Sequence, residues 1–216
     1  PAGRAINIVQ SHNVYININL LKTMKASEFS NILAAIIVLT IVISLSFLIK
    51  GNFSTLALSF LFASIIILIH VFSKKLIAFA LDANVEHQLW GISRFGFESK
   101  HHLKKEFPAG IVFPLFLSLV SIGTFKLMTL LVYETRALKV RAAKRFGFYS
   151  YTEITEWHNG VIGAAGIVSV LLLSLISYLL PSSSSFNLEI LAKMAAFYSF
   201  WNIIPISNLD GSQIFF

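Results

Sequence analysis

Asn31 to Ile49 (NILAAIIVLTIVISLSFLI) is a run of 19 residues without a charged side chain. A transmembrane helix needs about 20 predominantly apolar residues to cross a hydrocarbon core of about 30 Å. This run therefore predicts a membrane span. Further apolar runs predict three more spans, at Phe53 to Phe72, Gly160 to Leu180 and Leu188 to Ile204.

The helical pattern of the second run does not end with its last apolar residue. It continues through Lys74 and Lys75 to Leu81. Long cationic side chains near the end of a span commonly extend towards water. We therefore expect this helix to leave the bilayer with both lysines snorkelling.

The composition agrees with a membrane protein and excludes a soluble enzyme. The chain is 56% hydrophobic and 12% charged, with a mean hydropathy of +0.77, whereas about a quarter of an ordinary globular sequence is charged. A formal charge of +7 in so apolar a chain indicates basic cytoplasmic loops rather than nucleic-acid binding, since no nucleic-acid motif accompanies it. Without cysteine there are no disulfides or thiolate ligands.

The two ends of the chain carry less information. Residues 1–28 form a polar, Asn-rich tail that precedes the first span and that we expect to lie outside the native fold. Residues 29–216 form one membrane domain. The sequence stops at Phe216 within an apolar run, which predicts that the domain continues.

The run from Ala109 to Tyr133 is interrupted by Pro114 and Lys126 and has two interpretations. If it crosses fully, the basic loops before and after it lie on opposite faces, and the positive-inside bias nearly vanishes. If it enters and returns, both basic loops share the cytoplasmic face. We prefer a re-entrant segment, because broken helices are tolerated where protein covers the freed backbone groups.

Two cytoplasmic stretches have their own predicted structure. Val85 to Phe97 combines aromatic and β-branched residues with two glycines, which predicts a small β hairpin at the membrane surface. The basic cluster that follows the re-entrant segment predicts a helix lying on anionic lipid headgroups. Its members are Arg136, Lys139, Arg141, Lys144 and Arg145. The predicted fold is thus an all-α polytopic membrane protein with about four spans, one re-entrant segment and one surface hairpin.

Candidate chemistry lies at two remote positions. His70 stands near the end of the second span, one helical turn before Lys74. Asp210 follows the last span in a spaced pattern, Asn202-x-x-Pro205-x-x-x-Leu209-Asp210-Gly211. Taken separately, His70 is typical of an interfacial polar residue and Asp210 of a turn. Together, the fixed offsets of the second pattern favour a functional motif.

This pattern resembles the site-2 protease family of intramembrane zinc metalloproteases. In that family H-E-x-x-H on one helix supplies two zinc ligands and a general base, and an N-x-x-P-x-x-x-L-D-G motif supplies the third ligand. The segment from His70 to Phe79 resembles the first motif, and Ala165-Gly166-Ile167 stands where the family commonly has A-G-P. The resemblance covers about residues 65–216. It implies the same order of spans, a membrane-surface hairpin and a re-entrant segment.

The departures from the family decide the expected activity. Val71 occupies the position of the catalytic Glu, and Lys74 that of the second His ligand. Zinc catalysis needs at least three protein ligands and a base, so no catalytic residue is intact and only His70 and Asp210 remain as ligands. We expect no zinc here, and we expect Lys74 to pair with Asp210 where the family holds its metal.

Three functions stay open at this point. The preferred one is a non-catalytic site-2-protease-like protein that binds a transmembrane substrate or partner helix. The first alternative is an active intramembrane metalloprotease with unorthodox ligands drawn from His87, His101, His102 or His158. That is disfavoured because adjacent residues such as His101 and His102 do not face one metal. The second alternative is a fragment of a small transporter, built on broken helices.

Overall fold

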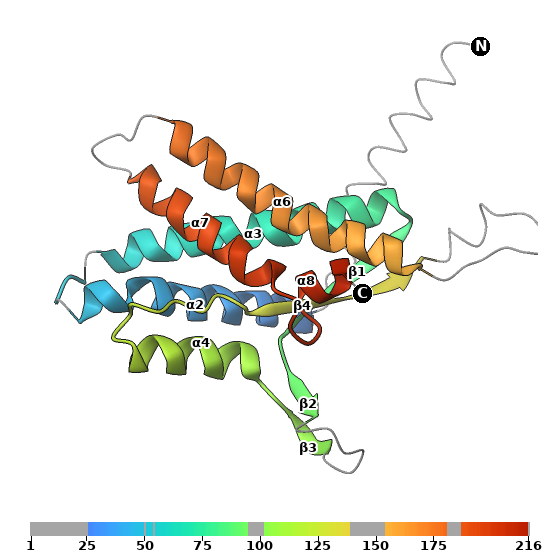
Figure 1. Ribbon diagram of the computed structural model, residues 1–216, viewed down its shortest axis with the longest axis horizontal. Helices are drawn as coiled ribbons and strands as arrows, with labels where there is room; N and C mark the ends of the chain where they lie inside the picture. Colours follow the sequence, from blue (N-terminus) through green and yellow to red (C-terminus); the bar gives the residue numbers. More distant parts are fainter. Residues whose placement is uncertain are drawn as a thin grey trace, which may run out of the picture.

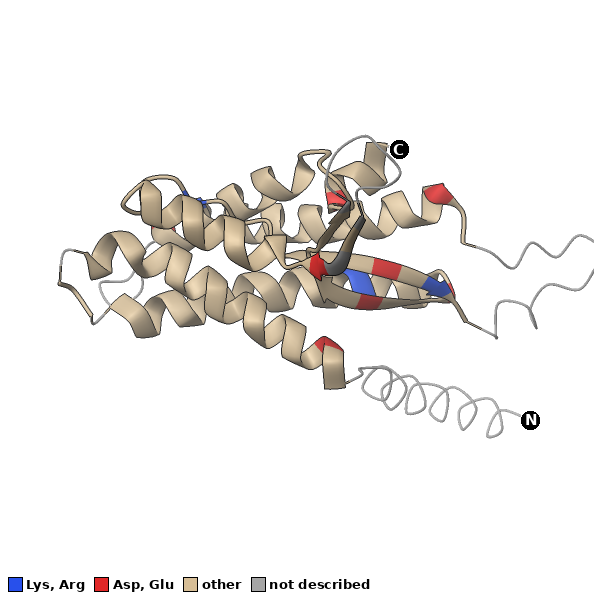
Figure 2. Cartoon of the chain, turned by 90° about the horizontal axis from the view of Figure 1, so that it is seen from below, with Lys and Arg blue, Asp and Glu red and all other residues tan. Residues whose placement is uncertain are grey.

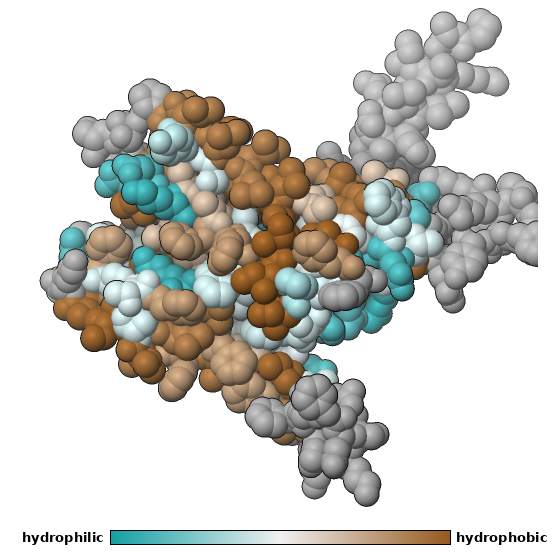
Figure 3. Space-filling view, viewed as in Figure 1, coloured by the Kyte–Doolittle hydropathy of each residue, from teal (hydrophilic) through white to brown (hydrophobic). Residues whose placement is uncertain are grey.

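The computed structural model is a mostly helical bundle with short strands gathered at one end (Figure 1). It describes residues 26–49, 51–53, 55–94, 102–138, 154–180 and 187–215. Figure 2 shows that the helices carry little visible charge, while charged residues gather on the strands. Much of the face seen in Figure 3 is hydrophobic over the helices and hydrophilic near the strands, which is compatible with a membrane protein.

Three of the described helices are long and apolar enough to cross a membrane: α2 (Ala26–Leu48), α3 (Thr55–Ala80) and α6 (Glu156–Leu179). Helix α3 packs between the other two. The inward face of α2 follows helical spacing, since Ala35, Leu39 and Val42 are fully buried. The predicted spans at 31–49, 53–72 and 160–180 therefore coincide with helices of spanning length.

The fourth predicted span is a shorter helix. Helix α7 (Leu188–Ile203) has 16 residues, or about 24 Å at 1.5 Å per residue, which is less than a hydrocarbon core of about 30 Å. It packs against α6 and ends before Pro205, because the residue preceding proline is biased towards extended backbone. A loop then leads to the short helix α8 (Asp210–Phe215).

The segment predicted to be re-entrant enters beside α2 and turns back. Helix α4 (Ala109–Val120) packs along α2 and ends in a turn, where Gly123 has a φ of +73° and its carbonyl accepts a 2.6 Å hydrogen bond from Ser46 Oγ. The chain then returns in extended form to strand β4 (Leu131–Ala137). Only the first half of the predicted segment is helix, because the turn follows directly on Val120.

The strands pair differently from the predicted hairpin at 85–97. Strand β1 (Ala83–Leu89) pairs antiparallel with β4, whereas β2 (Ile92–Arg94) pairs with β3 (His102–Phe107). The chain changes partner at Trp90, whose N–H donates to Leu130 O and whose carbonyl accepts from the Gly110 N–H. Residues 95–97 of the predicted hairpin lie outside the described part. Figure 1 shows β2 and β3 projecting away from the bundle, and β1 with β4 against its end.

Candidate functional site

A cluster of polar side chains is buried where α3 and α8 meet beside α6. His70 and Lys74 lie one turn apart on α3, and Asp210 is the first residue of α8. The Lys74 Nζ atom lies 2.7 Å from each carboxylate oxygen of Asp210, and His70 Nε2 lies 2.9 Å from Oδ2. All three side chains are at most 1% exposed. The expected contact between Lys74 and Asp210 is confirmed, and the two remote stretches of chain converge.

Aromatic rings enclose this cluster on two sides. The Lys74 ammonium lies 4.3 Å from the ring centroid of Tyr133 on β4, a cation–π distance. The ring of His70 meets Tyr198 of α7 edge-on, with centroids 5.2 Å apart. The lysine charge is therefore compensated by one carboxylate and one π face, away from water.

The sequence predicts that both lysines of α3 snorkel, but in the structure neither does. Lys74 is fully buried and Lys75 is 8% exposed. Both turn inward because the fold brings a carboxylate to each. The attraction between the opposite charges offsets part of the free energy needed to remove an ammonium from water.

Glycines on α6 provide the space for this site. A Cβ atom at Gly166 would lie 2.5 Å from Lys74 Cε and 3.0 Å from His70 Nε2. A Cβ atom at Gly163 would lie 2.7 Å from the Tyr133 hydroxyl. Helix α6 can approach α3 and β4 this closely only because both positions lack a side chain.

The remaining motif residues determine the course of the backbone that leads to Asp210. Asn202 Nδ2 donates to Tyr198 O at 2.8 Å. Pro205 follows the end of α7, and Leu209 is fully buried against Trp90. At Gly211 a Cβ atom would clash with the backbone of Ile203, so the turn into α8 requires glycine. The spaced pattern therefore holds Asp210 at its position.

A second buried ionic cluster was not found from the sequence. Lys75 Nζ lies 2.8 and 2.9 Å from the two carboxylate oxygens of Glu28, and His87 Nδ1 lies 2.9 Å from Oε1. Glu28 is 2% exposed and belongs to the first turn of α2. The last positions of the predicted tail, residues 26–28, therefore belong to the first helix. The only available signal was an acidic residue shortly before an apolar helix.

His87 is neutral in this cluster. Burial, the largest cause, lowers its pKa to about 4, and the positive charge of Lys74 acts in the same direction, while the contact with Glu28 opposes both. A neutral imidazole at this position donates its Nδ1 hydrogen to the Glu28 carboxylate, since that nitrogen makes the contact.

Zinc does not fit the donor set of the first cluster. His70 and Asp210 supply two ligands, whereas zinc sites use at least three from the protein, and the third neighbour is a cation. Val71, which the resemblance puts in place of a general base, is 5% exposed within the apolar core. No group of three metal-ligating side chains occurs in the described part of the chain.

Neither His87 nor His158 completes a metal site in the described part of the chain. His87 pairs with Glu28, and His158 contacts Thr155 near the start of α6. His101 lies outside the described residues, and His102 begins β3.

The basic cluster begins in a strand and not in a surface helix. Arg136 lies on β4, where its guanidinium is within 4.0 Å of Glu86 and 3.7 Å of Glu134. It is in a strand because β4 continues its pairing with β1 as far as Ala137. Lys139, Arg141, Lys144 and Arg145 lie outside the described residues.

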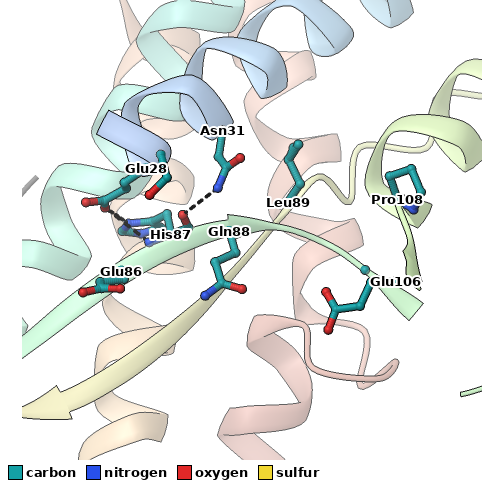
Figure 4. A pocket seen from close by; sticks show the side chains of 10 residues that line it. Glu28, Asn31, Glu86, His87, Gln88, Leu89, Glu106 and Pro108 are labelled. Carbon is teal, nitrogen blue, oxygen red and sulfur yellow. Dashed lines mark hydrogen bonds and ion pairs between the residues drawn. The ribbon is translucent and has the colours of Figure 1, made fainter. Parts of the chain in front are cut away.

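A cavity of about 380 Å³ opens beside the second cluster (Figure 4). The start of α2 lines it with Glu28 and Asn31, and β1 lines it with Glu86 to Leu89. Glu106 closes the opposite side.

No protein-family model, curated protein or solved structure matches this chain. These comparisons therefore assign the chain to no family.

Proposed function

We propose that this chain is a non-catalytic relative of the site-2 proteases, which binds a transmembrane substrate or partner helix without cutting it. In this proposal Lys74 takes the place of the zinc ion, and the Lys74–Asp210 ion pair replaces the electrostatic role of the metal. The supporting observation is the convergence of His70, Lys74 and Asp210 at one buried point, with distances of 2.7 to 2.9 Å.

The chemistry of these groups supports a binding role over a catalytic one. An ammonium one turn from His70 repels a divalent cation, and Val71 has no proton acceptor that could activate water. The apolar helix faces instead offer contact to lipid or to another helix, as the exposed Leu171, Leu175 and Phe200 illustrate. In this proposal the basic loops face the cytoplasm, against anionic headgroups.

The test is whether a single substitution recreates a metal site. Lys74→His would put a second imidazole one turn from His70, with Asp210 as third ligand. We expect wild-type protein purified in detergent to contain no stoichiometric zinc. We expect the variant to bind about one zinc per chain, measured by elemental analysis after dialysis.

Two controls make the result specific. Lys74→His combined with Asp210→Asn removes one of the three ligands and should lose the zinc. Lys193→His changes an exposed lysine of α7 and should bind none. If folded Lys74→His protein binds no zinc, the ligand geometry is not that of a lost metal site. Stoichiometric zinc in the wild type, abolished by Asp210→Asn, would favour the active metalloprotease.

A second measurement tests which side of the membrane each loop faces. Because the chain has no cysteine, single cysteines at Ser150 and Ser183 report on the two loops separately. We expect a membrane-impermeant maleimide to label Ser150→Cys only from the cytoplasmic side and Ser183→Cys only from the opposite side. Labelling of both from one side would contradict the proposed topology.

A further inference from the structure

The outer edge of β1 is closed by side chains at His87. This residue stands opposite Tyr133 in the β1–β4 ladder. Its backbone N–H donates to Glu28 Oε1 at 3.2 Å, and its carbonyl accepts from Asn31 Nδ2 at 3.4 Å. A neighbouring strand would satisfy the same two groups. The first turns of α2 therefore take the place of a third strand.

The other edge of the ribbon is closed at the same level. The carbonyl of Tyr133 accepts a 3.4 Å hydrogen bond from Gln213 Nε2 of α8. Open edges of two-stranded ribbons are templates for pairing with other chains, and proteins cover them by several means. Here the cover consists of side chains from helices at the two ends of the described chain.

The cover on β1 depends strongly on one carboxylate. Glu28 contacts the His87 amide, the His87 ring and Lys75 at the same time. Figure 4 shows Glu28 and Asn31 reaching down from α2 onto β1. Beyond them lies the cavity lined by Gln88, Leu89 and Glu106. If these two side chains withdraw, the strand edge faces this open space and not packed core.

We propose that the first turns of α2 form a latch, consisting of Glu28 and Asn31, that closes the outer edge of β1. Releasing the latch exposes the backbone groups of His87 to the cavity and makes the edge available for hydrogen bonding. The latch does not require the Lys74 site to be a former metal site. It is therefore independent of the proposed function.

Hydrogen exchange of the full chain in detergent micelles tests this latch. Glu28→Ala should raise the exchange rate of peptides covering residues 83–89 at least tenfold, with α3 peptides covering 60–70 unchanged. Asn31→Ala leaves every buried charge paired and should raise the same rate by a smaller factor. Glu189→Ala removes an exposed ion pair of α7 and should change neither region.

Glu28→Ala also leaves Lys75 without its carboxylate, so a second variant separates opening from unfolding. Glu28→Ala combined with Lys75→Met removes both charges and should still expose residues 83–89 while α3 stays protected. The latch is refuted if this double variant and Asn31→Ala both exchange like wild type over residues 83–89. It is refuted equally if exchange in α3 rises as much as exchange in β1.

Discussion

Two consecutive lysines of α3 enter two different ionic clusters. Lys74 meets Asp210 from the end of the described chain, and Lys75 meets Glu28 from its beginning. The first cluster is fully enclosed, whereas the second borders a cavity. The comparison shows that two neighbouring residues of one helix can form ion pairs with different structural roles, one deep in the bundle and one at its margin. The first fixes the packing of helices, and the second also covers a strand edge.

Removing the enclosed carboxylate should have the largest effect. Asp210→Ala leaves the Lys74 ammonium buried without a partner, which should cost about 3–5 kcal/mol of stability. Thermal unfolding in detergent micelles measures this loss. Lys74→Met combined with Asp210→Leu replaces the pair by apolar groups and should recover most of the stability. A double variant as unstable as the single one would show that the ion pair is not the source of the loss.

Acidification should have the next largest effect, by destabilising the cluster of Glu28, Lys75 and His87. An unfolded histidine titrates near 6.5, while His87 in the fold titrates at about 4. Between these values the unfolded chain binds a proton that the folded chain does not, so stability falls as the pH falls from 6.5 to 4. The loss is on the order of 3 kcal/mol across that window. His87→Gln should flatten the dependence, and an unchanged slope in this variant would rule out His87 as the cause.

A methyl group at Gly166 should act on the enclosed cluster only. Gly166→Ala brings a Cβ atom to 2.5 Å from Lys74 Cε, and overpacking of this kind costs about 1–3 kcal/mol. The unfolding temperature should fall. Gly160→Ala on the same helix is the control and should cost less, because the nearest atom to a Cβ atom there is 3.3 Å away. Equal losses in both variants would contradict a crowded site.

Removing an exposed ion pair should have the smallest effect on the unfolding temperature. Lys193 Nζ lies 2.6 Å from Glu189 Oε1 on α7, and both side chains are more than half exposed. Solvent screening makes such pairs nearly neutral in stability. Glu189→Gln should leave the unfolding temperature unchanged, which would show that burial distinguishes the two α3 clusters from an ordinary surface pair. A loss comparable to that of Gly166→Ala would remove this distinction.

The sequence predicted the features that depend on local pattern. Uncharged runs of about 20 residues located α2, α3 and α6, because length and hydropathy alone define such helices. The spaced pattern from Asn202 to Gly211 singled out Asp210, because its fixed offsets resemble a known motif. The same motif supplied the partner of Lys74.

Features that depend on remote contacts were missed. The partner of β1 is β4, more than 40 residues further along the chain, and no periodicity within residues 85–97 reveals that choice. Glu28 was assigned to the tail that precedes the first apolar run. Its partners are 47 and 59 residues away, so its role exists only once the helices have packed.

The distance along the chain between each lysine and its carboxylate also bears on how the protein is made. Glu28 precedes Lys75 by 47 residues, whereas Asp210 follows Lys74 by 136. During synthesis from the N-terminus, α3 leaves the ribosome when the carboxylate of Lys75 has already been made, whereas that of Lys74 follows 136 residues later. A lone cation in a nascent membrane helix costs about 2.5–3.5 kcal/mol on insertion scales. The Lys74 charge of α3 is thus without its carboxylate until the segment that carries Asp210 has been made.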